Sequence, residues 1–396
     1  MILFYLDSQF YIVNADFISN STTESGGAIW SLGTIGNITG DFKSNSALES
    51  GGAIYNSGIV GLFADGQDVT FYNNTDSTGY NDLFGNETGT FHLNAQSGYN
   101  INFGGSIREV TALNINNDTS AANRGGDYVF NNTVDAGINL YNGANVKLST
   151  IKQTDGSTSY GVINTTKTMT VDNVAGSNID MRNDHIDTNT VGGLTLGSNL
   201  GLSIDTDLYR HSTSSSDKLI STSAATGDGK IVIDAINLTH SAYGEGDSMT
   251  VNIADNNTKG KITIADDILD NITGATNYYT KVEYDEDTGD LVFTDKLVNK
   301  STLDQALQDV GVGDMSIYAK TADVYTQTQA DNKFATQESL GSYVTSSSLS
   351  TTLGGYATTD SVYTKTQADN TFAAKNNVYT KSEIDTTLGG YVTTSG

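Results

Sequence analysis

The sequence contains no cysteine and no proline. Without cysteine the chain has neither a disulfide framework nor a thiolate that could act as a nucleophile or metal ligand. Without proline, its turns must be made by the other residues that tolerate tight or left-handed backbone. The 42 glycines, together with abundant Asn, Asp and Ser, supply such residues. The composition therefore predicts many turns.

Basic residues are scarce: 46 acidic side chains stand against 20 Lys and Arg, a formal net charge of −26. A field of this sign repels a nucleic-acid duplex and an anionic membrane surface, so neither is expected as a partner. Cations, glycans and protein surfaces remain compatible with it. No sequence motif indicates a cofactor.

Long apolar segments are also missing, since no run reaches the roughly 18 residues that a membrane-spanning helix needs. The opening residues MILFYLDSQFYIV have no basic segment before them, and Asp7 and Gln9 interrupt their apolar character. They are therefore predicted to form a strand rather than a signal peptide. We expect the chain to be a fragment without its export signal and membrane anchor.

The sequence does contain an internal repeat. Residues 16–29 (DFISNSTTESGGAI) and 41–54 (DFKSNSALESGGAI) are identical at eleven of fourteen positions, 25 residues apart. A fixed offset of this length is typical of a stacked repeat. Up to residue 295, short runs with alternating apolar residues, such as GTFHLNA, NVKLST and KITIAD, predict strands bounded by turns. Three short strands and three turns use about 25 residues, which predicts one coil of a parallel β-helix.

The repeat also predicts which residues stack from one coil to the next. Phe17 and Phe42 are expected to lie over one another in the core, as are Ile29 and Ile54, whereas Asn20 and Asn45 are expected to stack at a turn, and Trp30 and Tyr55 follow in the same register. Gly26, Gly27, Gly51 and Gly52 are expected at a corner too tight for a Cβ atom. A third copy is predicted to begin at Phe71, with Asn74 three residues later.

These F-x-x-N and GGAI elements resemble the repeats of polymorphic outer-membrane proteins, a type of bacterial autotransporter passenger. The resemblance extends over about 290 residues, and its two opening copies are its most specific part. It implies a right-handed parallel β-helix, exported through a C-terminal barrel that this sequence does not show. It further implies a location at the cell surface and outer membrane, or secretion, and contact with glycans or proteins of host or bacterial cells.

Beyond residue 295 the pattern changes. Residues 296–315 are predicted to be a short helical linker, and residues 316–396 a repetitive, stalk-like region of short helices and turns. The stalk motifs resemble the YTK-x-E-I-D repeats of phage tail fibres, which implies a possible homotrimer. Helix-capping boxes are predicted at Thr326 with Gln329, Thr364 with Gln367, and Thr380 with Glu383.

Two acidic stretches are the candidates for catalysis. The first has Asp180, Asp184 and Asp187 near Arg182 and His185, and the second has Asp205 and Asp207 near Arg210 and His211. A glycosidase needs two such carboxyl groups flanking one sugar linkage. The favoured interpretation, however, is that they are solvated turn and strand-face charges, because acidic residues are common enough here for such clusters to arise by chance.

Metal sites are not indicated. His92, His185, His211 and His240 lack the close spacing of a zinc site. Asp285, Asp287 and Asp290 suggest a calcium loop, but the glycine and the final acid of such a loop are missing. The simpler and favoured prediction is a hairpin turn with Gly289 at a positive φ.

Two functional hypotheses follow. The first is a surface-displayed or secreted adhesin-like passenger without catalytic activity. The second is a phage tailspike or tail fibre, in which an acidic groove depolymerises a polysaccharide. The first is favoured because the passenger resemblance covers more of the chain.

Overall fold

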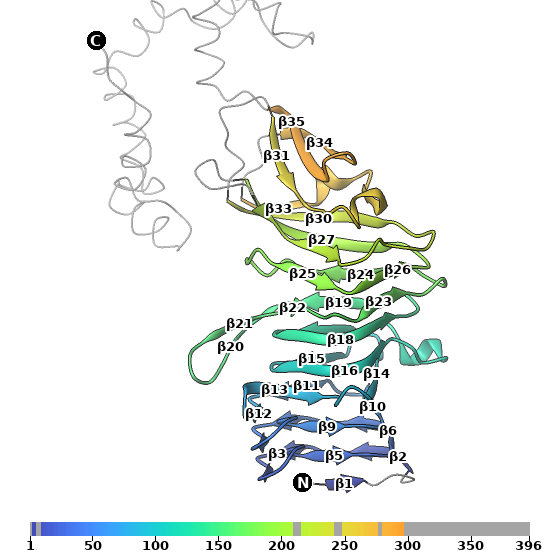
Figure 1. Ribbon diagram of the computed structural model, residues 1–396, viewed down its shortest axis with the longest axis vertical. Coiled ribbons are helices and arrows are strands. Elements are labelled where there is room, and N and C mark those ends of the chain that lie inside the picture. Colours follow the sequence, from blue (N-terminus) through green and yellow to red (C-terminus); the bar gives the residue numbers. More distant parts are fainter. Residues whose placement is uncertain (1, 5–8, 209–214, 241–247, 276–278, 297–396) are drawn as a thin grey trace, which may run out of the picture. The chain divides into compact units, whose positions relative to one another are not determined.

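The computed structural model describes residues 2–4, 9–208, 215–240, 248–275 and 279–296 (Figure 1). Apart from Lys296, which ends a strand and not a helix, the predicted linker (296–315) and stalk, with their six capping residues, lie outside the described residues, as do Arg210 and His211. The described residues belong to one compact unit, Met1–Leu297. None of the helices in this described part has the length and apolar character needed to span a bilayer.

The unit is a right-handed β-solenoid of about eight turns, which agrees with the predicted fold class. Most strands pair in parallel with the strand one turn earlier and one turn later, in sheets of 16 and 12 strands. Figure 1 shows these turns as successive layers from the N-terminal end onward. Each turn has three faces.

The first face is the 12-stranded sheet. Its strands are β3 (Phe17–Ile18), β7 (Phe42–Lys43), β11 (Val69–Tyr72), β15 (Asn100–Phe103), β17 (Asp127–Phe130), β19 (Asn145–Leu148), β24 (Ser177–Asp180), β27 (Leu200–Asp207), β30 (Ile231–His240) and β32 (Ile262–Ile264), with β28 (Ser215–Ser216) and β33 (Ile272–Gly274) at its side.

The second and third faces share the 16-stranded sheet, because two long strands turn a corner and belong to both: β16 (Ser106–Ile115) and β18 (Thr133–Leu140). The second face contains β1 (Ile2–Phe4), β5 (Ile29–Ser31), β9 (Ile54–Asn56), β13 (Gly79–Phe84) and β22 (Val162–Ile163), the corner strands β4 (Ser21–Thr22), β8 (Ser46–Ala47) and β12 (Thr75–Asp76), and the separate pair β25 (Thr188–Val191) and β29 (Lys218–Ser221). The third face contains β2 (Gln9–Asn14), β6 (Thr34–Thr39), β10 (Ile59–Ala64), β14 (Thr90–Ala95), β23 (Thr168–Val171) and β26 (Gly193–Leu196).

Two antiparallel elements are added to the stack. One is a hairpin of β20 (Thr150–Lys152) and β21 (Thr158–Tyr160), and the other is a terminal sheet of β31 (Met249–Asn252), β34 (Tyr279–Asp285) and β35 (Asp290–Lys296). The helical segments that the structure describes are short 3-10 turns: η1 (Ala121–Asn123), η2 (Lys259–Lys261) and η3 (Ile268–Asn271).

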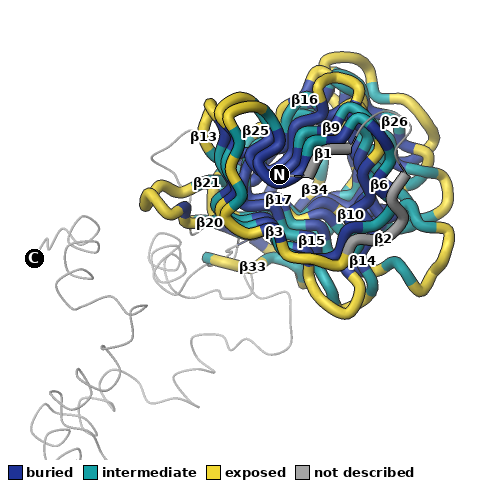
Figure 2. The backbone as a smooth tube through the Cα atoms, turned by 90° about the horizontal axis from the view of Figure 1, so that it is seen from below, coloured by how far each residue is buried: buried dark blue, intermediate teal, exposed yellow. Residues whose placement is uncertain are grey.

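Inward side chains form ladders along the stack. The longest aromatic ladder consists of Phe17, Phe42, Phe71, Phe103 and Phe130, with ring centroids 4.4–5.3 Å apart. Ile29, Ile54 and Leu83 form a second ladder on the next face. Figure 2 looks along the stack and shows the buried positions lining the interior, with the exposed loops outside. The predicted core register, including the third copy at Phe71, is observed.

The predicted asparagine stack forms a hydrogen-bonded ladder of Asn20, Asn45 and Asn74. Asn20 Nδ2 donates to Asn45 Oδ1 (2.9 Å), and Asn45 Nδ2 donates to Asn74 Oδ1 (2.9 Å). Asn45 Oδ1 also accepts from the backbone of Asn20, and its Nδ2 donates to the carbonyl of Phe17. The Asn45 amide thus has all four of its hydrogen bonds inside the protein.

The glycine pairs form the predicted tight corner. Gly26 and Gly51 have φ values of 72° and 71°, which favour glycine. A Cβ atom at Gly27 would lie 2.0 Å from the carbonyl oxygen of Gly52, and one at Gly52 would lie 2.5 Å from that of Asn81. Adjacent coils therefore approach too closely here for any side chain.

The coils differ from the predicted regular unit in length. The phenylalanine ladder advances by 25 residues from Phe17 to Phe42, by 29 to Phe71 and by 32 to Phe103. The described strands range from two to ten residues rather than about five. Extra residues are accommodated in outward loops because only the inward positions must match the neighbouring coil. This explains why sequence identity fades while alternation persists.

Candidate functional site

The structure brings the two acidic stretches together on one flank of the solenoid. We call the group the acidic cluster; it consists of Asp180, Arg182, Asp184, His185, Asp187, Asp205, Asp217 and Asn237. Asp205 lies on β27, Asn237 is its partner on β30, and residues 181–187 form the loop after β24. Strands of successive coils thus supply side chains separated by more than fifty residues.

Asp205 is completely buried, so the interpretation of both stretches as solvated charges is wrong for this residue. Its Oδ1 accepts from Asn237 Nδ2 (2.5 Å) and its Oδ2 from the backbone amide of Asn183 (2.7 Å). Burial raises the pKa of Asp205, and the hydrogen bond from Asn237 opposes this rise. Both carboxylate oxygens are therefore used inside the protein.

Asp184 is exposed, as the solvated interpretation predicts, and has a left-handed φ of 62°. Its Oδ1 accepts from Asn237 Nδ2 (3.1 Å), the same nitrogen that donates to Asp205. A single amide group therefore joins a buried carboxylate and an exposed one. This pair comes closest to the two-carboxyl arrangement of a glycosidase.

Asp217 joins the two stretches through their backbone. Its Oδ1 accepts from the amide of Asp187 and its Oδ2 from the amide of Asp205, both at 2.7 Å. Desolvation raises the pKa of Asp217 to about 8, although these two hydrogen bonds oppose the rise. The geometry makes Asp217 a clamp that holds the loop of residues 181–187 against β27.

The other side chains of the cluster, which are half-buried or exposed, pair locally. Arg182 binds Asp180 through two nitrogens, at 2.8 and 2.9 Å. His185 stacks on Tyr160, with ring centroids 4.0 Å apart, and its Nδ1 lies 3.0 Å from Asp187 Oδ1. Arrangements of this kind order a loop.

Sequence reasoning missed Asp217 and Asn237. Neither belongs to a recognisable motif, and the role of each comes from the hydrogen bonds that it makes to a neighbouring coil. Asp207, which the sequence groups with Asp205, instead lies 3.2 Å from His240 Nδ1. A coil-by-coil alignment placing Asn237 opposite Asp205 could have found the asparagine.

The calcium-loop candidate is the predicted hairpin turn. Asp285 and Asp290 pair across the end of β34 and β35, and Gly289 has a φ of 81°. Asp285 Oδ1 accepts from the backbone of Asp287 (2.9 Å). Among the described residues, no group of three or more His, Asp or Glu is arranged to hold a metal ion.

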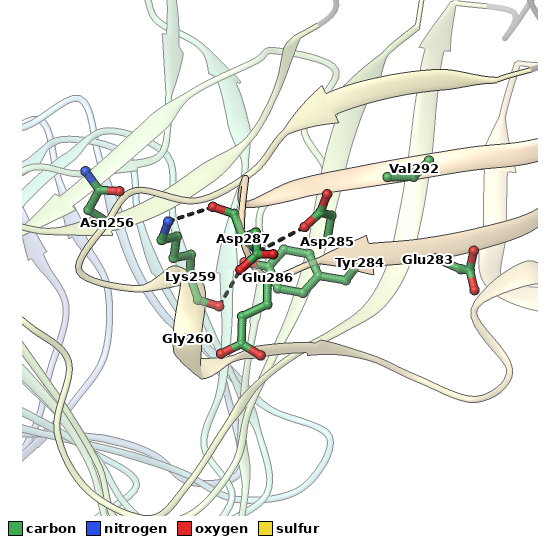
Figure 3. Close-up of a pocket in the computed structure, with 9 residues that line it drawn as sticks. All are labelled: Asn256, Lys259, Gly260, Glu283, Tyr284, Asp285, Glu286, Asp287 and Val292. Atoms are coloured by element: carbon green, nitrogen blue, oxygen red, sulfur yellow. Dashed lines mark hydrogen bonds between the residues drawn. The ribbon is translucent and has the colours of Figure 1, made fainter.

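A cleft of about 850 Å³ lies beside this turn (Figure 3). In Figure 3, Lys259 Nζ donates to the carbonyl of Asp287 (2.7 Å) and Tyr284 donates to the carbonyl of Lys259 (2.9 Å). Desolvation and the neighbouring carboxylates raise the pKa of Tyr284 to about 12. These contacts hold the terminal sheet against η2.

A second cleft, of about 560 Å³, lies beside the β20–β21 hairpin, which we call the arm (residues 150–160). Figure 1 shows the arm extending from the stack and running along it toward earlier turns. Thr154 Oγ1 donates to Asn73 Oδ1 (2.7 Å), and Gln153 Nε2 donates to the carbonyl of Gly104 (2.8 Å). The arm is therefore fastened to coils that precede it by 49 to 81 residues. We call this cleft the arm groove.

The sequence matches no protein-family model, no curated protein and no solved structure in the comparisons made.

Proposed function

We propose that this chain is an adhesin-like passenger of the polymorphic outer-membrane protein type, which binds glycans or proteins of other cells through the flank of its solenoid. It acts at the cell surface or after secretion, and it has no catalytic activity. The β-solenoid supports this proposal because stacked coils produce an extended, rigid surface. The GGAI repeats support the more specific passenger type.

The observation that carries the non-catalytic part is the hydrogen bonding of Asp205 and Asp217. All four of their carboxylate oxygens accept from groups of the protein itself, three of them backbone amides. A general acid must direct its proton toward the substrate, and a nucleophile must have a free oxygen. Carboxylates used in this way fasten one coil to the next.

The test is binding of the fluorescently labelled full chain to panels of bacterial and animal cells. We expect saturable binding that unlabelled chain displaces. Binding to none of the cells, at concentrations up to the high micromolar range, would contradict the proposal. Digestion of surface glycans or proteins beforehand identifies which of the two is bound.

A polysaccharide depolymerase of the tailspike kind is the second candidate, and the closeness of Asp184 and Asp205 favours it. This function predicts release of reducing ends from capsular polysaccharides by the full chain. Asp184→Asn should abolish the release without unfolding the protein, because Asp184 is exposed. Unchanged release in this variant would exclude Asp184 from the reaction.

A further inference from the structure

The arm groove is bounded by two walls of different origin. One wall is the arm, and the other is formed by β13, β16 and β18 of the stack. Tyr80 of β13 contacts the arm directly: its hydroxyl lies 3.0 Å from Thr154 Oγ1 and accepts from the amide of Asp155 (3.2 Å). Because the arm is fastened at its tip and at Gln153, the groove is already formed without a ligand.

The cationic side chains at the groove are already neutralised. Arg108 lines it and binds the buried carboxylate of Asp76, while its guanidinium lies over the ring of Phe84 at 5.4 Å. Asp135, also in the lining, binds Lys167 (3.2 Å) and Thr165 (2.7 Å). An anionic ligand thus finds no unpaired cation among these residues.

Two carboxylates remain for a ligand. Among the described residues, the carboxylate of Glu109 has no hydrogen-bond or ion-pair partner. Asp155, on the arm, is held ionised because hydrogen bonds from the side chain and backbone of Ser157 lower its pKa. The remaining lining is uncharged and hydrogen-bonding, with Thr78, Ser106, Asn132, Thr133 and Ser157.

Glu109 is also held in an unusual conformation. Its φ is 54°, in the left-handed region that side-chain-bearing residues adopt at a cost, and it lies where the register of β16 shifts against β18. Strained residues of this kind concentrate at binding and catalytic sites. The shift lets successive residues, Arg108 and Glu109, both line the groove.

We propose that the arm groove binds a short, neutral oligosaccharide, with the Glu109 carboxylate accepting hydrogen bonds from neighbouring sugar hydroxyls. This inference rests on the proposed function, since it names the ligand class and the place on the flank. Carboxylate and amide oxygens accept hydrogen bonds from hydroxyl donors, and the lining supplies such groups in Glu109, Asp155 and Asn132. The volume lies within the range of roughly 300–1,000 Å³ that is typical of small-molecule sites. The net negative field disfavours uronates and other acidic sugars.

The test measures binding of the full chain by calorimetry to cellotriose, maltotriose, N,N′,N″-triacetylchitotriose and N-acetyllactosamine. Trigalacturonate serves as the anionic probe, and chitosan trimer and trilysine serve as cationic probes. We expect binding of at least one neutral probe, with little dependence on salt. Preference for trigalacturonate, or strongly salt-dependent binding of the cationic probes alone, would overturn the assignment of a neutral ligand.

Glu109→Gly is the decisive variant, because glycine adopts the left-handed backbone without strain while the carboxylate is lost. We expect folding to be unaffected and affinity for the neutral probe to fall roughly ten- to hundredfold, as for a lost charge-assisted hydrogen bond. Glu87→Gly is the matched control, since Glu87 is also left-handed, at 56°, but exposed and outside the lining. Equal affinity in the two variants would show that the groove is not the site.

Cell binding separates this inference from the proposed function. If Glu109→Gly binds cells as well as the unmodified chain and also keeps its affinity for sugar, the groove assignment fails and the adhesin proposal stands. If the unmodified chain binds sugar in the groove but no cells, the adhesin proposal fails and the groove assignment stands.

Discussion

The asparagine ladder of the first coils and the acidic cluster of the later coils both fasten neighbouring turns, but with different chemistry. In the first coils the ladder of Asn20, Asn45 and Asn74 connects turns with uncharged amides. In the later coils the carboxylates of Asp205 and Asp217 accept backbone amides in a comparable way. An amide both donates and accepts, so it can repeat indefinitely along a stack. A carboxylate only accepts, and its burial ties the contact to pH.

Asp82 marks the transition between the two. Asn74 Nδ2, at the end of the ladder, donates to Asp82 Oδ1 (2.9 Å), and the amide of Gly105 donates to Asp82 Oδ2 (2.6 Å). Complete burial raises the pKa of Asp82 to about 7. The asparagine ladder thus ends on an acceptor that titrates near neutral pH.

The largest effect is expected from a substitution that disrupts the apolar stack beneath both kinds of contact. Ile54→Asp places a carboxylate between Ile29 and Leu83, where the side chain is fully buried, and should lower the free energy of unfolding by at least about 4 kcal/mol. Guanidinium denaturation followed by circular dichroism measures this. Ile59→Asp is the control, because Ile59 is exposed and should change stability by less than about 0.5 kcal/mol. Equal stability of the two variants would refute the register.

The next largest effect is expected from a substitution that disrupts only the asparagine ladder. Asn45→Leu removes four hydrogen bonds and leaves the carbonyl of Phe17 and the Asn20 amide groups without their partner, at a cost of about 2–4 kcal/mol. The same denaturation experiment applies. Asn256→Leu, at an exposed asparagine, should be nearly neutral. A neutral Asn45→Leu would mean that the ladder contributes nothing to stability.

The third prediction concerns the pH dependence of stability, which a buried carboxyl group confers and an amide does not. Because the folded pKa of Asp217, about 8, lies above the ordinary aspartate value of 3.8 that applies in the unfolded chain, the folded state binds the extra proton. The contribution of Asp217 to the free energy of unfolding is therefore largest below about pH 4 and decreases as the pH rises toward 8. Between pH 5 and pH 8.5 the unmodified chain should lose about 2 kcal/mol or more relative to Asp217→Asn, since each pKa unit corresponds to about 1.4 kcal/mol. Parallel pH profiles of the two proteins would contradict the raised pKa.

The smallest effect concerns Asp82. Its pKa is also raised, to about 7, so its contribution to stability also falls with rising pH, but over a narrower pH range than that of Asp217. Stability from Asp82 should fall as pH rises from about 4 to 7 and should be level above that. Asp82→Asn should remove this dependence of stability on pH. Because the substitution also removes one hydrogen-bond acceptor, the two proteins are compared by the slope of stability against pH and not by their absolute stability. Carbon-13 chemical shifts of the aspartate carboxyls, recorded against pH, give the titration directly. A midpoint near 4 would show that burial does not dominate at this residue.

The candidate site was predictable only in part. The acidic stretches were visible in the sequence as clusters, because Asp184 and Asp187 lie close to one another along the chain. Asp217 and Asn237 were not, since their roles arise from pairing with a coil some thirty residues away. The arm groove was equally hidden: Asp155 and Tyr80 meet only because the arm folds back over earlier coils.

The sequence by itself determined the solenoid, its register and its tight glycine corner, because stacking makes neighbouring coils repeat the same inward residues at the same offset. It also determined the turn at Gly289, which depends on local backbone alone. Only the tertiary structure decided which carboxylates are buried and which remain free. Burial and pairing depend on loops of variable length that pass over the repeat, and no periodicity constrains where such loops lie. For this reason Asp205 is buried and hydrogen-bonded between coils, whereas the Glu109 carboxylate lines the arm groove.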